Sequence, residues 1–317
     1  MTVPSPLPMD VAGVTVAVVG PEVAGAVVAI IHAAFGERPV LDPPSTALTE
    51  SEASVADALA RHGGLLARRD GRPVGALLLG VAEESLLLRR VSVVPEAQGT
   101  GVATALADAA AEVARARGLR RVHLTARTEL PGTIGFWAGL GYREVGRAGA
   151  LLTLAKELAV ECEVATADQM RTLGQRVAGL LRAGDLIICT GHLGAGKTTF
   201  TQGIGAGLGV RGDVTSPTFV ISRVHPSRHG SPPLVHADAY RLGGLAELDD
   251  LDLDVSLEDS VTVVEWGEGL AEPLAEDRLE VTITRSRGAS ADGERRTVRL
   301  DPVGARWVGS DLAAAVT

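Results

Sequence analysis

One ten-residue segment, GHLGAGKTTF at residues 191–200, constrains this chain more than any other feature. It matches the pattern G-x-x-x-x-G-K-[S/T], in which glycines let backbone N–H groups point at phosphate oxygens and a lysine adds positive charge. Residues 185–190 before it predict a buried strand, and residues 198–208 after it predict a helix that ends at Gly209. This order predicts an α/β domain that binds a nucleoside triphosphate, the alternative being a plain turn.

The loop itself indicates which groups would contact the nucleotide. Gly191, Gly194 and Gly196 free the backbone N–H groups to face phosphate, and the helix that follows adds positive potential at its N-terminus. Lys197 would supply a charge for the β- and γ-phosphates, and the hydroxyl of Thr198 would reach Mg²⁺.

Two carboxylates follow at the ends of two further predicted strands. The apolar run before Asp238 and the run before Glu265 each place an acid at a strand's carboxyl end. In open α/β sheets ligands bind beyond these ends, so both acids would face the nucleotide. A solvated residue at a strand end is the alternative for each of them.

Four segments, taken in order, resemble the TsaE (YjeE) family. They are GHLGAGKTTF, VTSPTFVI from Val214, HADAYRL from His236 and VVEWGE from Val263, and the resemblance runs from residue 162 to about residue 300. The family comprises small bacterial ATPases of the tRNA threonylcarbamoyladenosine pathway. The resemblance implies that Thr198, Glu265 and Asp238 lie at the Mg²⁺, with Asp238 also near the attacking water.

The resemblance further implies the residues that bind ATP and those that act on it. Lys197, Asp238 and Glu265 would be catalytic, with Lys197 and the loop amides stabilising charge as water attacks the γ-phosphate. Ser216 and Thr218 would lie in a loop over that phosphate. The full ATP-binding set would be Gly191, Gly194, Ala195, Gly196, Lys197, Thr198, Thr199, Ser216, Thr218 and Trp266.

Partners and departures follow from the same resemblance. TsaB and TsaD would form the competent complex, in which TsaD transfers the threonylcarbamoyl group to adenosine 37 of tRNA. His192 stands where the family often has an acid, which we expect to change affinity and not chemistry. Arg241 is a candidate contact to phosphate or partner, or else a surface ion pair.

The first half of the chain carries a second glycine-rich loop, QGTGVA at residues 98–103. A predicted strand at 86–94 leads into it and a helix ending near Gly118 follows; then come a strand at 121–125 and a helix at 131–142. With a predicted hairpin around residues 69–72, this order resembles the GNAT acetyltransferase superfamily over residues 11–154. The resemblance implies acetyl-CoA as cofactor, bound by Val93, Gln98, Gly99, Gly101 and Ala103.

The acetyl acceptor stays open at this point. Members that acetylate a ribosomal protein N-terminus use a Glu base and a Tyr acid, but the matching positions here are Thr125 and Trp137. Tyr142 and His123 are possible substitutes, or else core residues. Transfer by positioning a neutral amine beside the thioester, or a CoA-binding module without catalysis, would each fit.

The sequence therefore predicts two α/β domains with a very short linker. Residues 1–157 would form a GNAT domain with a mixed, mainly antiparallel sheet and flanking helices. Residues 160–317 would form a P-loop NTPase-like α/β sheet, in which a capping-box pattern at Thr166 and Gln169 opens a helix that ends at Gly184. We expect a Mg²⁺-dependent ATP hydrolase joined to an N-acetyltransferase. The alternative is a P-loop small-molecule kinase joined to a non-catalytic acetyl-CoA-binding module.

Composition limits the partners and the compartment. A formal net charge of −9 argues against direct binding of nucleic acid phosphates, so tRNA would be reached through the complex. Cys162 and Cys189 are too few for a disulfide scaffold or a zinc site, and we expect two buried, reduced thiols. The chain shows neither a signal-peptide pattern nor an apolar run of about 18 residues, so we expect a cytoplasmic protein without membrane segments.

Overall fold

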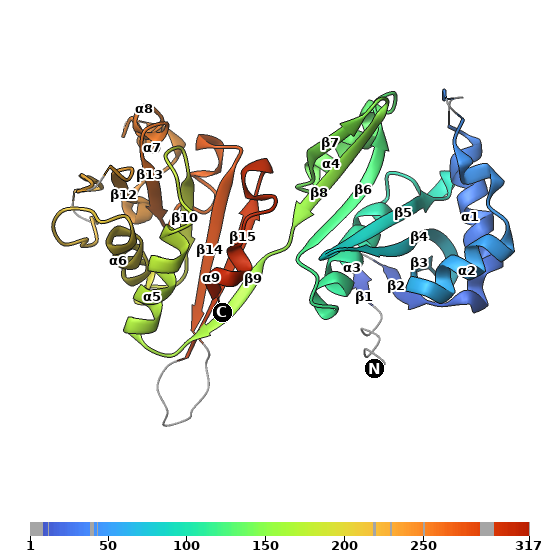
Figure 1. The fold of residues 1–317 in the computed structure, drawn as a ribbon, viewed down its shortest axis with the longest axis horizontal. Helices are drawn as coiled ribbons and strands as arrows, with labels where there is room; N and C mark the ends of the chain where they lie inside the picture. Colours follow the sequence, from blue (N-terminus) through green and yellow to red (C-terminus); the bar gives the residue numbers. More distant parts are fainter. Residues whose placement is uncertain are drawn as a thin grey trace. The chain divides into compact units, whose positions relative to one another are not determined.

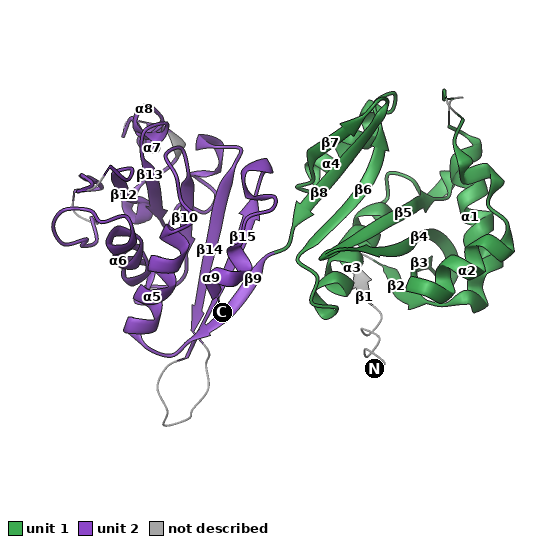
Figure 2. Cartoon of the chain, viewed as in Figure 1, with its two compact units in different colours: residues 1–158 green, residues 159–317 purple. Residues whose placement is uncertain are grey.

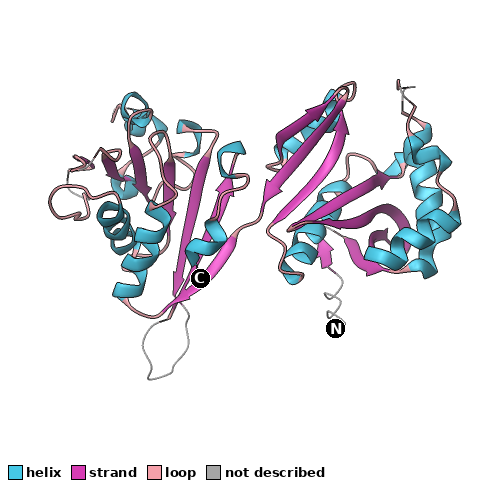
Figure 3. Cartoon of the chain, viewed as in Figure 1, coloured by secondary structure: helices cyan, strands magenta, loops and turns pink. Residues whose placement is uncertain are grey.

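The computed structural model describes residues 9–11, 13–38, 41–42, 44–217, 220–228, 230–249, 251–285 and 295–316. The chain divides into two compact units, Met1–Leu158 and Ala159–Thr317, which Figure 2 shows in separate colours. Each unit is built around one sheet with helices on both of its faces (Figure 3). No helix in these described ranges is long and apolar enough to cross a membrane.

The first unit contains an eight-stranded sheet in the order β1-β2-β3-β4-β5-β6-β8-β7. All neighbouring strands in it are antiparallel except β5 and β6, which confirms the predicted mixed, mainly antiparallel sheet. Its elements (Figure 1) are β1 (Met9–Val11), β2 (Val14–Val19), α1 (Ala24–Gly36), α2 (Glu52–His62), β3 (Gly64–Arg69), β4 (Arg72–Ala82), β5 (Ser85–Val93), α3 (Val102–Ala116), β6 (Arg121–Arg127), α4 (Pro131–Gly139), β7 (Arg143–Ala148) and β8 (Leu151–Glu157).

Alternation along the strands separates two cores in this unit. Leu77 and Leu79 of β4 pack with α3 and α4, whereas Ala76 and Leu78 pack with α1 and α2. Successive side chains of a strand point to opposite faces, so the sheet is covered on both sides. Asp70 and Gly71, which join β3 to β4, both have positive φ angles, as a two-residue hairpin turn requires.

Strands β5 and β6 separate before either of them ends. Their parallel pairing begins at Ser85 and stops at the pair Leu88↔Leu124. Beyond it β5 continues along β4 to Val93, and β6 continues along β8 to Arg127. The divergence opens the sheet between two strands and gives room for a ligand there.

The second unit contains a seven-stranded sheet in the order β11-β12-β13-β10-β14-β15-β9. Its four central strands, β12, β13, β10 and β14, are parallel, and its outer pairs are antiparallel. The elements are β9 (Val160–Val164), α5 (Ala167–Ala178), β10 (Leu186–Thr190), α6 (Lys197–Gly207), β11 (Ser222–His225), β12 (Leu234–Asp238), α7 (Leu245–Asp249), α8 (Leu253–Leu257), β13 (Val261–Glu265), β14 (Arg278–Arg285), β15 (Arg296–Val303) and α9 (Leu312–Val316).

This arrangement confirms the predicted P-loop-like α/β sheet. Ile187 and Cys189 of β10 pack in the core under α5 and α6, while Leu186 and Ile188 face the core under α7 and α8. Both faces of β10 are therefore buried, as for a central strand of a parallel sheet. The predicted strand that enters the phosphate loop lies between β13 and β14.

Three details differ from the sequence expectations. The capping box at Thr166 forms, but helix α5 ends at Ala178 and not at Gly184. The helix predicted over 131–142 ends at Gly139, because Gly141 takes a left-handed conformation that turns the chain into β7. Both cysteines are free as expected, but only Cys189 is buried; Cys162, on the outer strand β9, is partly exposed.

Close packing of α5 against α6 gives a stability prediction. A Cβ added at Gly203 of α6 would overlap the carbonyl oxygen of Arg171 in α5. We expect Gly203→Ala to lower the free energy of unfolding by about 1–3 kcal/mol, because the helices must move apart. Urea unfolding measures it, with Gly244→Ala as control, since a Cβ at Gly244 meets nothing within 4 Å. Equal stability of the two variants would contradict the close approach.

Candidate functional site

The phosphate loop joins β10 to α6 at the carboxyl edge of the parallel sheet. Its last residue, Gly196, caps the N-terminus of α6 with a φ of 117°, a conformation open mainly to glycine. At Gly191 a Cβ would overlap the carbonyl oxygen of Ile283 in β14. These two positions explain why the loop needs glycine where the motif has it. The loop amides and the helix N-terminus together form a place for an anion.

Lys197 is buried and its side chain turns back over the loop. Its Nζ donates to the carbonyl oxygens of Gly191 at 2.7 Å and His192 at 3.3 Å, and lies 3.7 Å from the ring centroid of Trp266. Burial lowers the pKa of Lys197, and the nearby acids, chiefly Glu265, act in the opposite direction. The ammonium is thus held over the loop where the sequence predicts phosphate.

The two predicted acids lie side by side at the same edge of the sheet. Asp238 ends β12 and Glu265 ends β13, and the two residues are direct partners in the parallel register. Glu265 is also in register with Cys189 of β10, the strand that leads into the loop. The hydroxyl of Thr198 donates to Glu265 Oε2 at 3.0 Å. The structure therefore brings Lys197, Thr198, Asp238 and Glu265 to one place.

Asp238 is buried and engaged on both of its carboxylate oxygens. Oδ1 accepts from the backbone N–H of Tyr240 at 3.0 Å, and Oδ2 accepts from the hydroxyl of Ser216 at 3.2 Å. Ser216 is itself exposed, so the segment that carries it comes to the site from the surface. Thr218, the other residue predicted from this segment, lies outside the described residues.

Three residues near the site were missed by sequence reasoning. His236 is fully buried, and its Nε2 lies 2.8 Å from Glu265 Oε1. The ring of Tyr240 packs at a tilt against Trp266, with a ring-centroid distance of 5.0 Å. Arg285 donates from Nη2 to the carbonyl oxygen of Gly194 at 2.6 Å. The spacing of His236 from Asp238 could have identified it, because residues 236 and 238 of one strand point to the same side of the sheet.

The backbone at Trp266 is strained. Its φ is 61°, an uncommon value for a bulky side chain, and its N–H donates to the carbonyl oxygen of Cys189 at 2.9 Å. Strain of this kind persists only where the surroundings enforce it and is frequent at functional sites. Arg241, a further candidate from the sequence, lies exposed in the short 3-10 helix Ala239–Arg241 after β12.

The donor atoms suit a hard cation. The Thr198 hydroxyl and the Glu265 and Asp238 carboxylates offer oxygen ligands, which Mg²⁺ prefers, and Mg²⁺ usually keeps waters and takes substrate phosphate oxygens besides. In the described part of the chain, no three His, Cys, Asp or Glu side chains gather closely enough to hold a metal ion. The set thus fits an ion shared with a phosphate rather than a closed protein cage.

The second glycine-rich loop lies between β5 and α3 in the first unit. Gly101 caps α3 with a φ of 86°, so the backbone turns sharply into the helix. Arg69 of the hairpin holds the loop by donating to the hydroxyl of Thr100 at 2.9 Å and to its carbonyl oxygen at 3.0 Å. The side-chain amide of Gln98 donates to the carbonyl oxygen of Val93 at 3.2 Å. Loop and strand end are thereby fixed to one another.

A cavity of about 560 Å³ adjoins this loop. Four of the five residues predicted to bind acetyl-CoA line it, namely Val93, Gln98, Gly99 and Ala103. Gly101 does not line it, and a Cβ there would meet nothing within 4 Å. We refer to this space as the CoA-side cavity.

A second cavity of about 270 Å³ opens where β5 and β6 diverge, and we refer to it as the acceptor-side cavity. It is lined by Thr125 and Trp137, the two positions that match a Glu base and a Tyr acid in members that acetylate a ribosomal protein N-terminus. By contrast, His123 and Tyr142 line neither cavity. Tyr142 is buried edge-on against Trp137, and burial raises its pKa. Burial also lowers the pKa of His123. Among the described residues that line this cavity, none is an Asp, Glu, His, Cys, Lys or Tyr that could replace the missing pair.

Comparison with known proteins finds one family match in each unit. The family model "Threonylcarbamoyl adenosine biosynthesis protein TsaE" matches residues 164–297, and "Acetyltransferase (GNAT) family" matches residues 27–142. The tRNA threonylcarbamoyladenosine biosynthesis protein TsaE of Streptomyces coelicolor is 64% identical over 145 residues, which are 45% of this chain and 97% of that protein. The Bacillus subtilis protein of the same name is 36% identical over 141 residues, 44% of this chain and 84% of that protein.

Among solved structures, the PaiA N-acetyltransferase of Thermoplasma acidophilum in complex with coenzyme A matches with a TM-score of 0.41 and 13% identity, over 45% of this chain and 98% of that one. The extent and identity of the sequence matches to TsaE proteins carry the assignment of the second unit. This chain belongs to the TsaE family, and a domain of the GNAT acetyltransferase family precedes the TsaE part within it.

Proposed function

We propose that the second unit hydrolyses ATP with Mg²⁺ and supports threonylcarbamoyl transfer to adenosine 37 of tRNA, together with TsaB and TsaD. The observation that carries this proposal is the meeting of Lys197, Thr198 and Glu265 beneath one phosphate loop, in a chain of the TsaE family. We propose further that the first unit is an acetyl-CoA-dependent N-acetyltransferase. An assay of thioester cleavage can test this role.

In the proposed ATP site each group has a defined task. The amides of residues 191–199 and the ammonium of Lys197 bind the phosphates and stabilise the charge that develops on the γ-phosphoryl oxygens. Asp238 orients the attacking water, and the segment that carries Ser216 covers the γ-phosphate. Trp266 packs beside the nucleotide, near Lys197.

The proposed metal site uses oxygen donors that are already close together. Thr198 and Glu265 would hold Mg²⁺, with Asp238 nearby and the remaining ligands from phosphate and water. When bound, the ion neutralises charge on the phosphates. His236 keeps the Glu265 carboxylate in orientation through the Nε2 contact.

A tRNA-modifying role also leads us to propose a cytoplasmic protein that meets tRNA through its partners.

In the first unit the proposed reaction uses both cavities, one for acetyl-CoA and one for the amine. Val93, Gln98, Gly99, Gly101 and Ala103 would bind acetyl-CoA, with the pyrophosphate at the N-terminus of α3. An amine entering through the acceptor-side cavity would meet the thioester where β5 and β6 diverge. Without a Glu and Tyr pair, catalysis would rest on holding a neutral amine beside the thioester.

Two assays on the purified chain test this proposal. We expect Mg²⁺-dependent release of inorganic phosphate from ATP that stops when EDTA removes the metal, and release of CoA from acetyl-CoA with an amine acceptor. Transfer of the γ-phosphate to a metabolite in preference to water would contradict the ATPase and favour a small-molecule kinase. Binding of acetyl-CoA without CoA release for any amine would leave the first unit a binding module.

A further inference from the structure

The acceptor-side cavity has an unusual charge pattern. More than half of the described residues that line it are apolar, and the charged residues among them are three arginines, with no carboxylate. The arginines come from three elements: Arg38 follows α1, Arg90 lies in β5, and Arg127 ends β6. What this cavity can bind therefore depends on which of these positive charges is already compensated by the protein.

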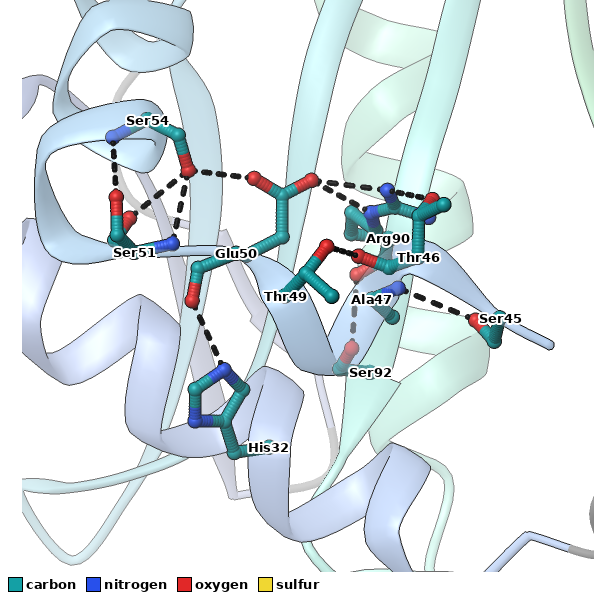
Figure 4. A network of polar contacts seen from close by, with 10 residues as sticks. All are labelled: His32, Ser45, Thr46, Ala47, Thr49, Glu50, Ser51, Ser54, Arg90 and Ser92. Atoms are coloured by element: carbon teal, nitrogen blue, oxygen red, sulfur yellow. Dashed lines mark hydrogen bonds and ion pairs between the residues drawn. The ribbon is translucent and has the colours of Figure 1, made fainter.

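The charge of Arg90 is compensated by Glu50 (Figure 4). The Nη2 of Arg90 lies 2.9 Å from Glu50 Oε1 and donates to the hydroxyl of Thr46 at 2.8 Å. Glu50 also accepts from the hydroxyl of Ser54 at 2.6 Å, at the start of α2. The pair ties the 3-10 helix Thr46–Thr49 to β5 and leaves no net charge for a ligand.

The charge of Arg127 is compensated as well. Its guanidinium pairs with Glu129 and donates to the carbonyl oxygen of Asp42 at 2.7 Å. The hydrogen bond to Glu129 raises the pKa of Arg127 and lowers the pKa of Glu129 to about 2. Arg127 thus fixes the cavity wall and has its charge balanced by a neighbour.

Arg38 differs from both. Its guanidinium lies 3.8 Å from the ring centroid of Phe35, and no carboxylate pairs with it within the described ranges. It lines the CoA-side cavity and the acceptor-side cavity, as do Val91, Leu130, Thr133 and Trp137. A partly buried cation with an aromatic contact and no acidic partner at the junction of two cavities can pair with an anionic ligand.

We propose that Arg38 binds the carboxylate of the acetyl acceptor, and that the acceptor is a free α-amino acid with an apolar side chain. The inference rests on the proposed acetyltransferase function. Since Arg38 borders both cavities, the carboxylate it binds lies close to the thioester, so only a few bonds can separate carboxylate and amine. The apolar side chain would lie among Phe35, Leu41 and Leu151 of the acceptor-side cavity.

The acetyl transfer needs no reactant besides acetyl-CoA and the amine. The neutral amine nitrogen attacks the thioester carbonyl carbon, the C–N bond forms, and the C–S bond breaks. CoA leaves as a thiolate and takes up the proton that the nitrogen loses. The products are an N-acetyl amino acid and CoA, and the carboxylate of the acceptor stays unchanged and bound to Arg38 throughout.

The test compares leucine with leucinamide, in which a neutral carboxamide replaces the carboxylate and the amine is less basic, at a pH where both amines are largely neutral. CoA release is measured for the full chain with acetyl-CoA and either acceptor, and acetyl-CoA binding is measured by calorimetry. We expect kcat/KM for leucine to exceed that for leucinamide by about 10- to 100-fold, as for loss of a hydrogen bond to a charged group. Arg38→Gln should reduce this ratio to about one and leave acetyl-CoA affinity unchanged.

Arg72→Gln is the matched control, since Arg72 is exposed on the hairpin and lines neither cavity. The control should keep the preference for leucine. Equal turnover of acid and amide, or a peptide N-terminus preferred to both, would overturn the inference while the acetyltransferase function stands. Weakened acetyl-CoA binding in Arg38→Gln with an unchanged ratio would assign Arg38 to CoA and overturn it too. No CoA release with any amine would overturn the proposed function itself.

Discussion

Replacing Lys197 by alanine is expected to lower kcat/KM for ATP by about 1000-fold, the upper range for loss of one charge-stabilising donor. The ammonium lies over the phosphate loop, held by the carbonyl oxygens of Gly191 and His192. Its removal takes away the cation that lies over the loop and leaves Trp266 without its cation contact. The rate of phosphate release, measured at several ATP concentrations, gives kcat/KM.

Arg182→Ala serves as the control for a lost positive charge. Arg182 is exposed in the connection between α5 and β10, away from the loop. We expect this variant to keep wild-type turnover and thermal stability. A Lys197→Ala protein that hydrolyses ATP within a factor of about three of wild type would show that phosphate is bound elsewhere.

Replacing Glu265 by glutamine is expected to lower kcat by about 100-fold, with a smaller effect on the affinity for ATP. Glutamine keeps the shape of the side chain and can still contact Thr198 and His236, but it has no negative charge for a cation. Because the affected group is a proposed metal ligand, half-maximal activity should require a higher Mg²⁺ concentration. Activity is titrated with Mg²⁺, and Mn²⁺ binding is titrated by electron paramagnetic resonance. Together the two titrations measure the loss of turnover and the loss of metal affinity.

Glu268→Gln is its matched control, because Glu268 lies three residues further along the chain and is exposed. This variant should titrate with Mg²⁺ as the wild type does. If Glu265→Gln showed the same Mg²⁺ dependence as Glu268→Gln, the assignment of Glu265 as a metal ligand would be wrong.

Much of the second unit was predictable because its signals are local. A strand, a glycine loop and a helix follow one another in sequence, and strand ends alone located Asp238 and Glu265 at the carboxyl edge. The contact between His236 and Glu265 was not predictable, because it depends on the register of β12 against β13. The roles of the site residues in catalysis stay predictions until the variants are measured.

The first unit was predictable in its fold but not in the cavity that opens where β5 and β6 diverge. Residues 98–103 carry a local loop pattern, whereas the acceptor-side cavity is assembled from α1, β5, β6 and the segments that follow them. No spacing in the sequence distinguishes Arg38 from Arg90 or Arg127. Only the contacts of Glu50 and Glu129 show which of the three guanidinium charges is left for a ligand.

Helix ends were the least predictable local feature. Gly179, not Gly184, follows the last residue of α5, and the backbone of Gly179 stays in the right-handed region. The sequence offers several glycines after this helix, and the choice among them depends on how Leu180 and Leu181 pack against the core. Tertiary packing therefore decided a boundary that capping patterns left open.

Formation of threonylcarbamoyladenosine in a reconstituted system tests the proposed role of the second unit in tRNA modification. TsaB, TsaD, tRNA, a threonylcarbamoyl donor and ATP are incubated with this chain or its Lys197→Ala variant, and modified adenosine 37 is counted by mass spectrometry over many turnovers. We expect repeated modification with the wild-type chain and ATP consumption stimulated by the partners, with both lost in the variant. Equal modification with either protein, or with neither present, would contradict a role for this ATPase in the pathway.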